Sequence, residues 1–361
     1  MNIYVMAANT QQSLRKALGV LKDSTKVGLV NLNSDKKWLD IAIVKATNHE
    51  EVLPKEKHIK TILDAVSSSK PRADVAYCIQ GLAKRLAKTR NWTVALKTLI
   101  VIHRSLREVG PTFCQELINY SQGKALTLNL SHFSDDSSPV AWDYSAWVRT
   151  YALYLEERVE CYRILKYDII EKMCWKDKRL DVPEMLEQLP PLQQLLFRLL
   201  ACKPEGAASS NSLIHHALSI VVGESVNLYV TITDGINILV EKYFVMPGHY
   251  AIRTLEIYKK AGNQADSLSE LFEICRGLEF GRGEKYVKIE QTPASFLSAM
   301  EDYVKDAPTS LMFQSTAVSA DRCIPPVEAP QVVATPEANL LTKKQDTHDV
   351  KENSDQSVAK P

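Results

Sequence analysis

Glycine is scarce in this sequence, and so are the long apolar runs that mark membrane proteins. The 361-residue chain has 13 glycines at scattered positions, about half the usual ~7%, so it lacks the closely spaced turns that many β-hairpins need. No apolar run reaches the roughly 18 residues of a bilayer span, because Glu224 and Asp234 interrupt the best stretch, residues 217–240. These absences favour a helical protein without a transmembrane helix.

Clustered cysteines and a secretory leader are also missing. The seven cysteines contain no Cys-x-x-Cys pair, and an odd number at long spacings predicts buried free thiols better than disulfides or a zinc site. No basic residue precedes Arg15, so the chain lacks the basic start of a signal peptide. With 45% apolar and 24% charged residues, it is interpreted as an ordinary cytosolic protein.

The familiar sequence signatures of enzymes are absent as well. The sequence has no Gly-rich P-loop, no His-Glu-x-x-His and no Gly-x-Ser-x-Gly. His215 and His216 are adjacent, so on a helix they point about 100° apart and cannot share a metal. We therefore expect no catalytic residue, no cofactor and no metal site. An enzyme acting on lipid head groups stays as an alternative, and Glu50, Glu51 and Glu56 would be its nearest carboxylates to the basic segment described below.

Helical periodicity dominates the first 306 residues, and no convincing strand pair or fixed repeat is visible. The sequence thus predicts an all-α protein, and it leaves an irregular helical solenoid open. Residues 308–361 contain six of the 16 prolines and no glycine, which is typical of a disordered tail. One helix is expected to end near Lys45, the next to begin at Pro54, and a third to centre on residues 95–106. Further helices are expected over residues 72–89, 111–120, 143–168, 183–202, 212–244, 249–261 and 267–277.

An aromatic series lies in the expected helix 143–168 and just before it. Its members are Trp142, Trp147, Tyr151, Tyr154 and Tyr162. Such a series is found in platforms that stack nucleic-acid bases. The spacing, however, puts several of these rings on one stripe with Leu155 and Val159, so core packing is the preferred interpretation.

The near-zero net charge hides an asymmetry along the chain. Residues 1–110 carry 19 basic and 9 acidic side chains, a net charge of +10, whereas the remaining 251 residues carry −9. A basic end of this size suits an anionic partner such as nucleic acid, an acidic protein or the anionic cytoplasmic leaflet. The alternative is a set of solvated helix faces that bind nothing.

Within the basic end, one constellation stands out between residues 45 and 58. Lys45 closes one helix, and Lys55, Lys57 and His58 occupy the first turn of the next. Free backbone N–H groups and the helix dipole favour anions there, so cationic side chains oppose local helix stability, which indicates a function. If the turn folds Lys45 back toward the start of the next helix, the four side chains form an exposed site for a multiply phosphorylated head group. Nearby lysines could support it: Lys26, Lys36, Lys37 and Lys60.

These residues resemble the phosphoinositide motif of the ANTH domain of clathrin assembly proteins. Further blocks resemble the plant members of that family, over roughly residues 13–306: 40–49, 142–158, 236–244, 291–297 and 300–304. The resemblance implies three regions, namely a flexible N-terminus (1–12), an ANTH-like helical membrane-binding domain (13–306) and a disordered tail (307–361).

The resemblance also implies a function and a set of partners. It implies a superhelical solenoid that binds phosphatidylinositol 4,5-bisphosphate through Lys45, Lys55, Lys57 and His58. It implies no nucleic-acid partner. Family members assemble clathrin, bind vesicle SNAREs and meet adaptor complexes, as peripheral proteins of plasma-membrane coated pits, clathrin-coated vesicles and the Golgi. The tail shows no clathrin- or adaptor-binding peptide. The competing hypothesis is a helical scaffold that binds acidic protein partners through the basic N-terminal end.

Overall fold

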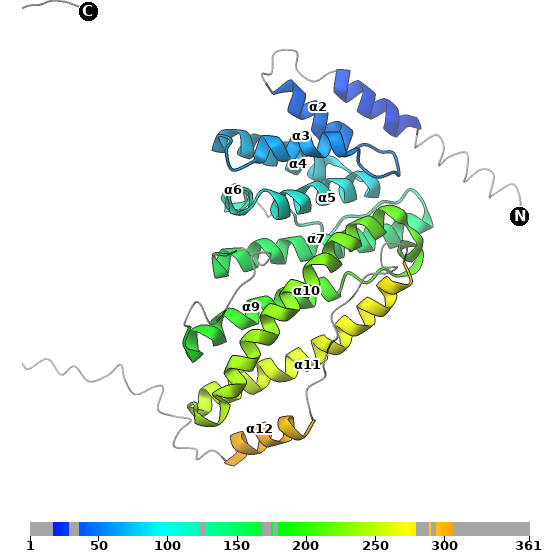
Figure 1. Ribbon diagram of the computed structural model, residues 1–361. Helices are drawn as coiled ribbons and strands as arrows, with labels where there is room; N and C mark the ends of the chain where they lie inside the picture. Colours follow the sequence, from blue (N-terminus) through cyan, green and yellow to red (C-terminus); the bar gives the residue numbers. More distant parts are fainter. Residues whose placement is uncertain are drawn as a thin grey trace, which may run out of the picture. The chain divides into compact units, whose positions relative to one another are not determined.

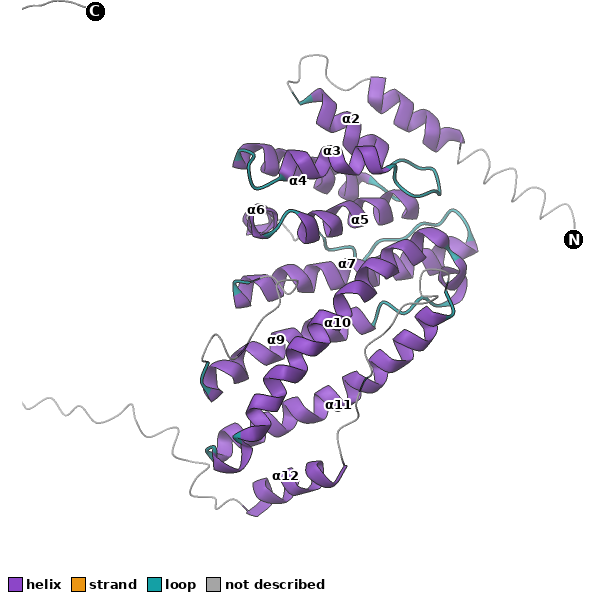
Figure 2. Cartoon of the chain, in the orientation of Figure 1, coloured by secondary structure: helices purple, strands orange, loops and turns teal. Residues whose placement is uncertain are grey.

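The computed structural model describes residues 17–28, 36–122, 128–167, 175, 180–278, 289 and 294–306. Within these ranges every regular element is helical and no strand occurs (Figure 2), which confirms the all-α prediction. The predicted flexible N-terminus (1–12) and disordered tail (307–361) lie outside the described residues, as do Cys174 and Cys323.

The helices form an irregular solenoid in which each packs on its neighbours in the sequence (Figure 1), as expected. A first helix covers residues 17–28. The others are α2 (Lys37–Ala46), α3 (Glu56–Val66), α4 (Arg72–Lys88), α5 (Trp92–Glu108), α6 (Pro111–Gln122), α7 (Pro139–Leu165), α9 (Val182–Leu200), α10 (Ser212–Glu241), α11 (Gly248–Arg276) and α12 (Ala294–Asp306), with short 3-10 turns η1 (Gly206–Ser210) and η2 (Tyr243–Val245).

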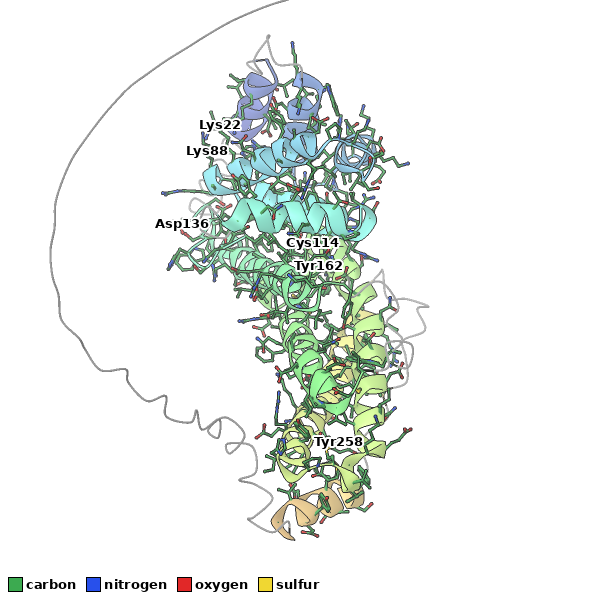
Figure 3. The ribbon with its side chains drawn as sticks, turned by 90° about the vertical axis from the view of Figure 1, so that its left-hand side faces the viewer. Lys22, Lys88, Cys114, Asp136, Tyr162 and Tyr258 are labelled. Atoms are coloured by element: carbon green, nitrogen blue, oxygen red, sulfur yellow. The ribbon has the colours of Figure 1, made fainter. Side chains whose placement is uncertain are left out.

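One apolar core runs through the stack, and its side chains fill the space between the helix layers (Figure 3). Helix α5 is buried on almost every side between its neighbours. The prediction of buried free thiols is confirmed for Cys78, Cys114, Cys161, Cys202 and Cys275. Burial raises the pKa of the Cys78 thiol to about 12, so this thiol stays protonated and unreactive.

Two helix predictions need correction. Residues 249–261 and 267–277 belong to a single helix, α11, because the buried Gln264 and Ala265 continue its packed face past Gly262. Helix α3 begins at Glu56 with Lys55 as its N-cap, so Pro54 precedes the helix instead of opening it. In the aromatic series Trp147, Tyr151 and Tyr154 are core residues as predicted, but Trp142 is 63% exposed.

A buried ionic cluster joins α5, α7 and α10. Glu224 of α10 is almost fully buried, and its Oε1 lies 3.2 Å from both His103 Nε2 and Arg158 Nη1 and 3.4 Å from Arg107 Nε. The Tyr154 hydroxyl donates a hydrogen bond to its other oxygen. Burial opposes ionisation of Glu224, but the charges of His103 and Arg158 outweigh it and lower its pKa to about 2. The cluster therefore holds a carboxylate inside the core.

Helix α10 is apolar over most of its length. Within the described ranges it is the one helix long and apolar enough to cross a membrane, whereas the sequence predicts no such helix. Its side chains from Leu213 to Leu239 are largely buried against the neighbouring helices. Core helices commonly reach the same length and apolar content, so the packing accounts for this composition.

Candidate functional site: a cationic loop and helix start

The loop between α2 and α3 is held in place by a buried lysine. Lys97 of α5 is fully buried, and its Nζ donates hydrogen bonds to Asn48 Oδ1 at 2.6 Å and to the Glu50 carbonyl oxygen at 2.5 Å. Burial lowers the pKa of Lys97 to about 8. An ammonium group with two fixed acceptors inside the protein gives the exposed loop a defined conformation.

Asp23 ties the first helix to the same loop. Its Oδ2 accepts hydrogen bonds from the backbone N–H of His49 at 2.8 Å and from His49 Nδ1 at 2.7 Å. Its Oδ1 accepts one from Arg85 Nη2 at 2.8 Å, and Arg85 also donates to the Thr47 carbonyl oxygen at 2.7 Å. Burial alone would raise the pKa of Asp23, but these hydrogen bonds from His49 and Arg85 lower it. Arg85 thus has a structural role and is not available to a ligand.

The carboxylates nearest the predicted site are all paired. Glu56, between Lys55 and Lys57, accepts two hydrogen bonds from Arg104 of α5, at 2.7 and 2.9 Å, and these lower its pKa. Glu51 Oε1 accepts a hydrogen bond from Asn211 Nδ2 at 2.9 Å. Glu50 Oε2 accepts one from Asn48 Nδ2 at 3.0 Å. The charge of Arg104 offsets that of Glu56, whereas Glu50 and Glu51 are bound by neutral amides and keep their negative charge.

The four predicted site residues come together at the junction of α2 and α3. Lys45 lies in the last turn of α2, Lys55 is the N-cap of α3, and all three lysines are exposed. Burial lowers the pKa of His58 below 6.5, and the charges of Lys57, Lys45 and Lys55 lower it further. All three ammonium groups therefore act on one imidazole. Within the described part of the chain, none of the four side chains makes an ion pair or a hydrogen bond.

The start of α3 has no side-chain cap, a feature that it shares with α2, α4 and α11 but not with several other helices of this fold. Asn91 caps α5, Asp181 caps α9 and Asn211 caps α10 through side-chain oxygens. Lys55 has no such oxygen, and the first amides of α3 receive no side-chain cap. An anion at this position would replace the missing cap and meet the positive end of the helix dipole.

The four lysines that could support the site differ in their surroundings. Lys36 is paired with Asp74 and its Nζ lies 5.0 Å from the centroid of the Tyr77 ring, so part of its charge is already balanced, and its supporting role stays a prediction. Lys60 is exposed, and its charge lowers the pKa of Glu56. Lys37 is partly buried at the first residue of α2.

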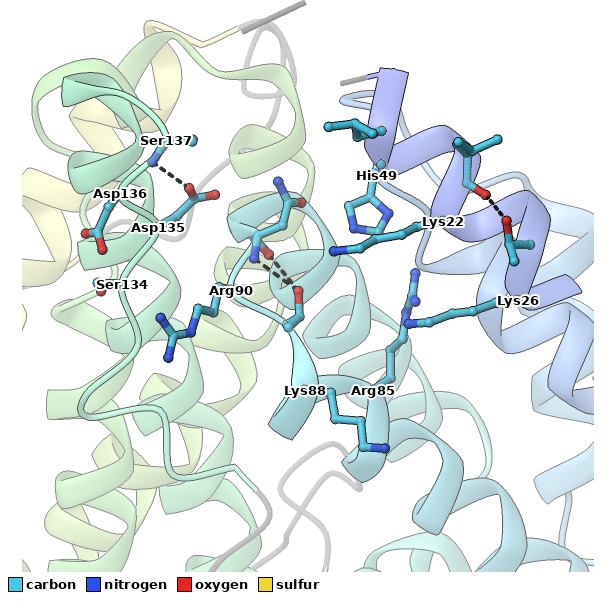
Figure 4. Close-up of a pocket in the computed structure, with 16 residues that line it drawn as sticks. Lys22, Lys26, His49, Arg85, Lys88, Arg90, Ser134, Asp135, Asp136 and Ser137 are labelled. Atoms are coloured by element: carbon cyan, nitrogen blue, oxygen red, sulfur yellow. Dashed lines mark hydrogen bonds between the residues drawn. The ribbon is translucent and has the colours of Figure 1, made fainter. Parts of the chain in front are cut away.

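Lys26 instead belongs to a second basic cluster that the sequence pattern did not predict. Together with Lys22, Arg85, Lys88 and Arg90 it lines a cavity of about 760 Å³ between the first helix, the end of α4 and the 134–137 loop (Figure 4). Asp135 and Asp136 lie on the opposite wall, so the cavity is of mixed charge. The four-residue spacing of Lys22 and Lys26 places both side chains on one helix face. This spacing is the feature of the sequence that could have predicted a basic cluster here.

The described residues contain no group of three or more His, Cys, Asp or Glu side chains that could hold a metal. His215 Nε2 lies 2.9 Å from the Ser209 carbonyl oxygen, and burial lowers the pKa of His216. A structural environment therefore accounts for both histidines.

Comparison with known proteins places this architecture in a family. The family model of the ANTH domain matches residues 38–306. Two Arabidopsis thaliana proteins, "Putative clathrin assembly protein At1g14910" and "Putative clathrin assembly protein At2g01600", are each 57% identical over 310 residues. Each alignment covers 83% of this chain but 45% and 54% of the two relatives. The chain thus spans about half the length of these relatives.

A solved structure shares the fold at low sequence identity. The ENTH domain of epsin-2, solved in complex with phosphatidylinositol 4,5-bisphosphate, matches with a TM-score of 0.53 and 19% identity. The match covers 71% of this chain and 97% of that domain. On the family model and the helical solenoid together, this chain belongs to the ANTH domain family.

Proposed function

We propose that this chain binds the head group of phosphatidylinositol 4,5-bisphosphate at a membrane surface through Lys45, Lys55, Lys57 and His58. The observation that carries the proposal is the convergence of three unpaired ammonium groups on His58 at an uncapped helix start. The pairing of Glu56 with Arg104 removes the nearest competing charge. The phosphatidylinositol 4,5-bisphosphate bound to the epsin-2 domain supports this head-group class.

The strength of such a site follows from its exposure. Each basic residue near an anionic leaflet contributes on the order of 1 kcal/mol, and the four groups lie on a surface instead of in a closed pocket. One head group is therefore held with modest affinity. Stable attachment needs several contacts with the same membrane, because linked sites gain affinity through effective concentration.

The wider role that we propose is that of a non-enzymatic clathrin adaptor. The names of the relatives support clathrin assembly, and the membrane site would place the chain at the cytoplasmic face of plasma-membrane coated pits and clathrin-coated vesicles, with the Golgi as a further site. Recruitment of vesicle SNAREs and contact with adaptor complexes are part of the same proposal.

Lipid selectivity separates this proposal from the scaffold for acidic proteins. The full chain should sediment with vesicles that contain phosphatidylinositol 4,5-bisphosphate several-fold better than with vesicles of equal surface charge made with phosphatidylserine, because convergent cations recognise clustered phosphates. A general basic surface responds to charge density and salt alone. Equal binding to the two vesicle types would reject the head-group site and favour the acidic-partner scaffold.

The pKa of His58 predicts a pH dependence. Because that pKa is lowered from 6.5 in the free protein, His58 is mostly neutral at pH 7.5 and gains charge as the pH falls. Binding to the anionic head group favours the charged form and takes up a proton, so affinity should rise on acidification. Phosphate groups lose charge over the same range, so we compare the wild type with His58→Gln. Vesicle binding curves that are parallel between pH 7.5 and 5.5 would contradict a role for His58.

A further inference from the structure

Two apolar side chains are exposed directly beside the proposed head-group site. Val52 is 55% exposed and Leu53 is 50% exposed, and Leu53 lies two residues before Lys55. Both belong to the loop between α2 and α3, which projects at one edge of the helix stack (Figure 2). Adjacent exposed aliphatic residues on a short loop present a convex apolar tip, not a groove that could hold a peptide.

The hydrogen bonds of the loop explain why this pair faces outward. The Glu50 carbonyl oxygen is bound by the buried Lys97, and the Glu51 side chain is bound by Asn211 at the start of α10. The Val52 backbone N–H donates to the Glu50 carbonyl oxygen at 2.9 Å. The Glu50 carbonyl oxygen and the Glu51 side chain are therefore bound by other helices, whereas the Val52 and Leu53 side chains are exposed to water.

From this arrangement we infer that Val52 and Leu53 insert into the membrane at the boundary between head groups and acyl chains while the adjacent cations bind phosphates. The inference rests on the proposed function, because the lysines bring the loop to the membrane. The occupant is a lipid surface because cations flank the apolar tip on its C-terminal side, which matches an anionic layer above a hydrocarbon layer. Side chains in that boundary leave water without needing a preformed pocket.

The test separates insertion from head-group recognition. Replacing both residues in the full chain (Val52→Ser/Leu53→Ser) should weaken binding to vesicles of phosphatidylcholine with phosphatidylinositol 4,5-bisphosphate by ~10- to 100-fold, the equivalent of withdrawing two partly buried aliphatic side chains. Binding of soluble inositol 1,4,5-trisphosphate, measured by calorimetry, should stay unchanged. Val245→Ser, at an 85% exposed site in η2, is the matched control and should leave vesicle binding unchanged.

A second measurement covers the case in which the serine variant disturbs the loop. The fluorescence of the variant Leu53→Trp should be quenched by vesicles with brominated acyl chains. This quenching should exceed that of the variant Val245→Trp, made in the same full chain. Equal quenching of the two variants, or wild-type vesicle affinity in the serine variant, would overturn insertion. Wild-type protein that binds neither the vesicles nor the soluble head group would instead overturn the proposed function.

Discussion

Charge reversal at the start of α3 should abolish most of the membrane binding. The variant Lys55→Glu/Lys57→Glu changes the local charge by four units at two exposed positions. At about 1 kcal/mol for each charge near an anionic leaflet, less the screening by salt, we expect vesicle affinity to fall by ~100- to 1,000-fold. Sedimentation with vesicles containing phosphatidylinositol 4,5-bisphosphate measures the loss. Neither side chain packs in the core, so thermal stability should stay near that of the wild type.

The matched control for charge reversal lies in the same basic half of the chain. Lys70 and Lys84 are exposed, and Lys70→Glu/Lys84→Glu produces the same change in net charge. If the head group is bound at α2 and α3, this control should lose little affinity and keep the preference for the bisphosphate. An equal loss in both double variants would show that total charge, not a site, drives the binding.

The second large effect is expected in the core. Replacing Glu224 with glutamine (Glu224→Gln) should lower the free energy of unfolding by about 3–5 kcal/mol, because it removes a buried carboxylate that lies 3.2 Å from the guanidinium of Arg158. Chemical denaturation of the full chain in urea measures this change. Glu160→Gln on the surface of α7 removes an exposed pair with Arg163 and should cost less than about 1 kcal/mol.

The same carboxylate gives the stability a defined pH dependence. The pKa of Glu224 is lowered to about 2 in the folded chain, whereas an unfolded glutamate titrates near 4.3. The contribution of ionised Glu224 to folding stability is therefore complete above the pKa of the unfolded chain, and it is lost as the pH falls through the pKa of the folded chain. The difference in stability between wild type and Glu224→Gln should be constant near neutral pH and shrink below about pH 4. A difference that stays constant down to pH 2 would contradict the low pKa.

Periodicity predicted the helices well but not all of their ends. The Ala261–Gly262–Asn263 segment is typical of a break in a helix, yet Gln264 Nε2 donates a hydrogen bond to the Gln193 carbonyl oxygen at 2.6 Å and keeps α11 continuous. A glycine inside a helix costs only about 1 kcal/mol, which such tertiary contacts exceed. At α3 the sequence predicted too early a start. Proline is favoured at the first helical position, but here Pro54 precedes the N-cap, Lys55.

For the site, local sequence located the cluster but not the partners of its charges. Lys45, Lys55, Lys57 and His58 are close in sequence, so one turn sufficed to bring them together. The pairing of Lys36 with Asp74 and of Glu56 with Arg104 joins residues 38 and 48 positions apart. Such contacts depend on helix packing and leave no local signal. The cavity around Lys22 and Lys88 also joins segments that are far apart in sequence, and the spacing of Lys22 and Lys26 is a local signal for one of its walls alone.

Asn211 has a mechanical consequence that follows from its two sets of bonds. Its Oδ1 accepts hydrogen bonds from the Leu213 and Ile214 amides at the start of α10, while its Nδ2 donates to Glu51 in the loop. A force on the loop between α2 and α3 is thus transmitted to the start of α10. Helix α10 has 30 residues and is about 45 Å long at 1.5 Å per residue. Helix α10 packs on α9 and α11 along that length. A force on residues 47–55 therefore reaches α10 through Asn211, in addition to α2 and α3 through the chain itself.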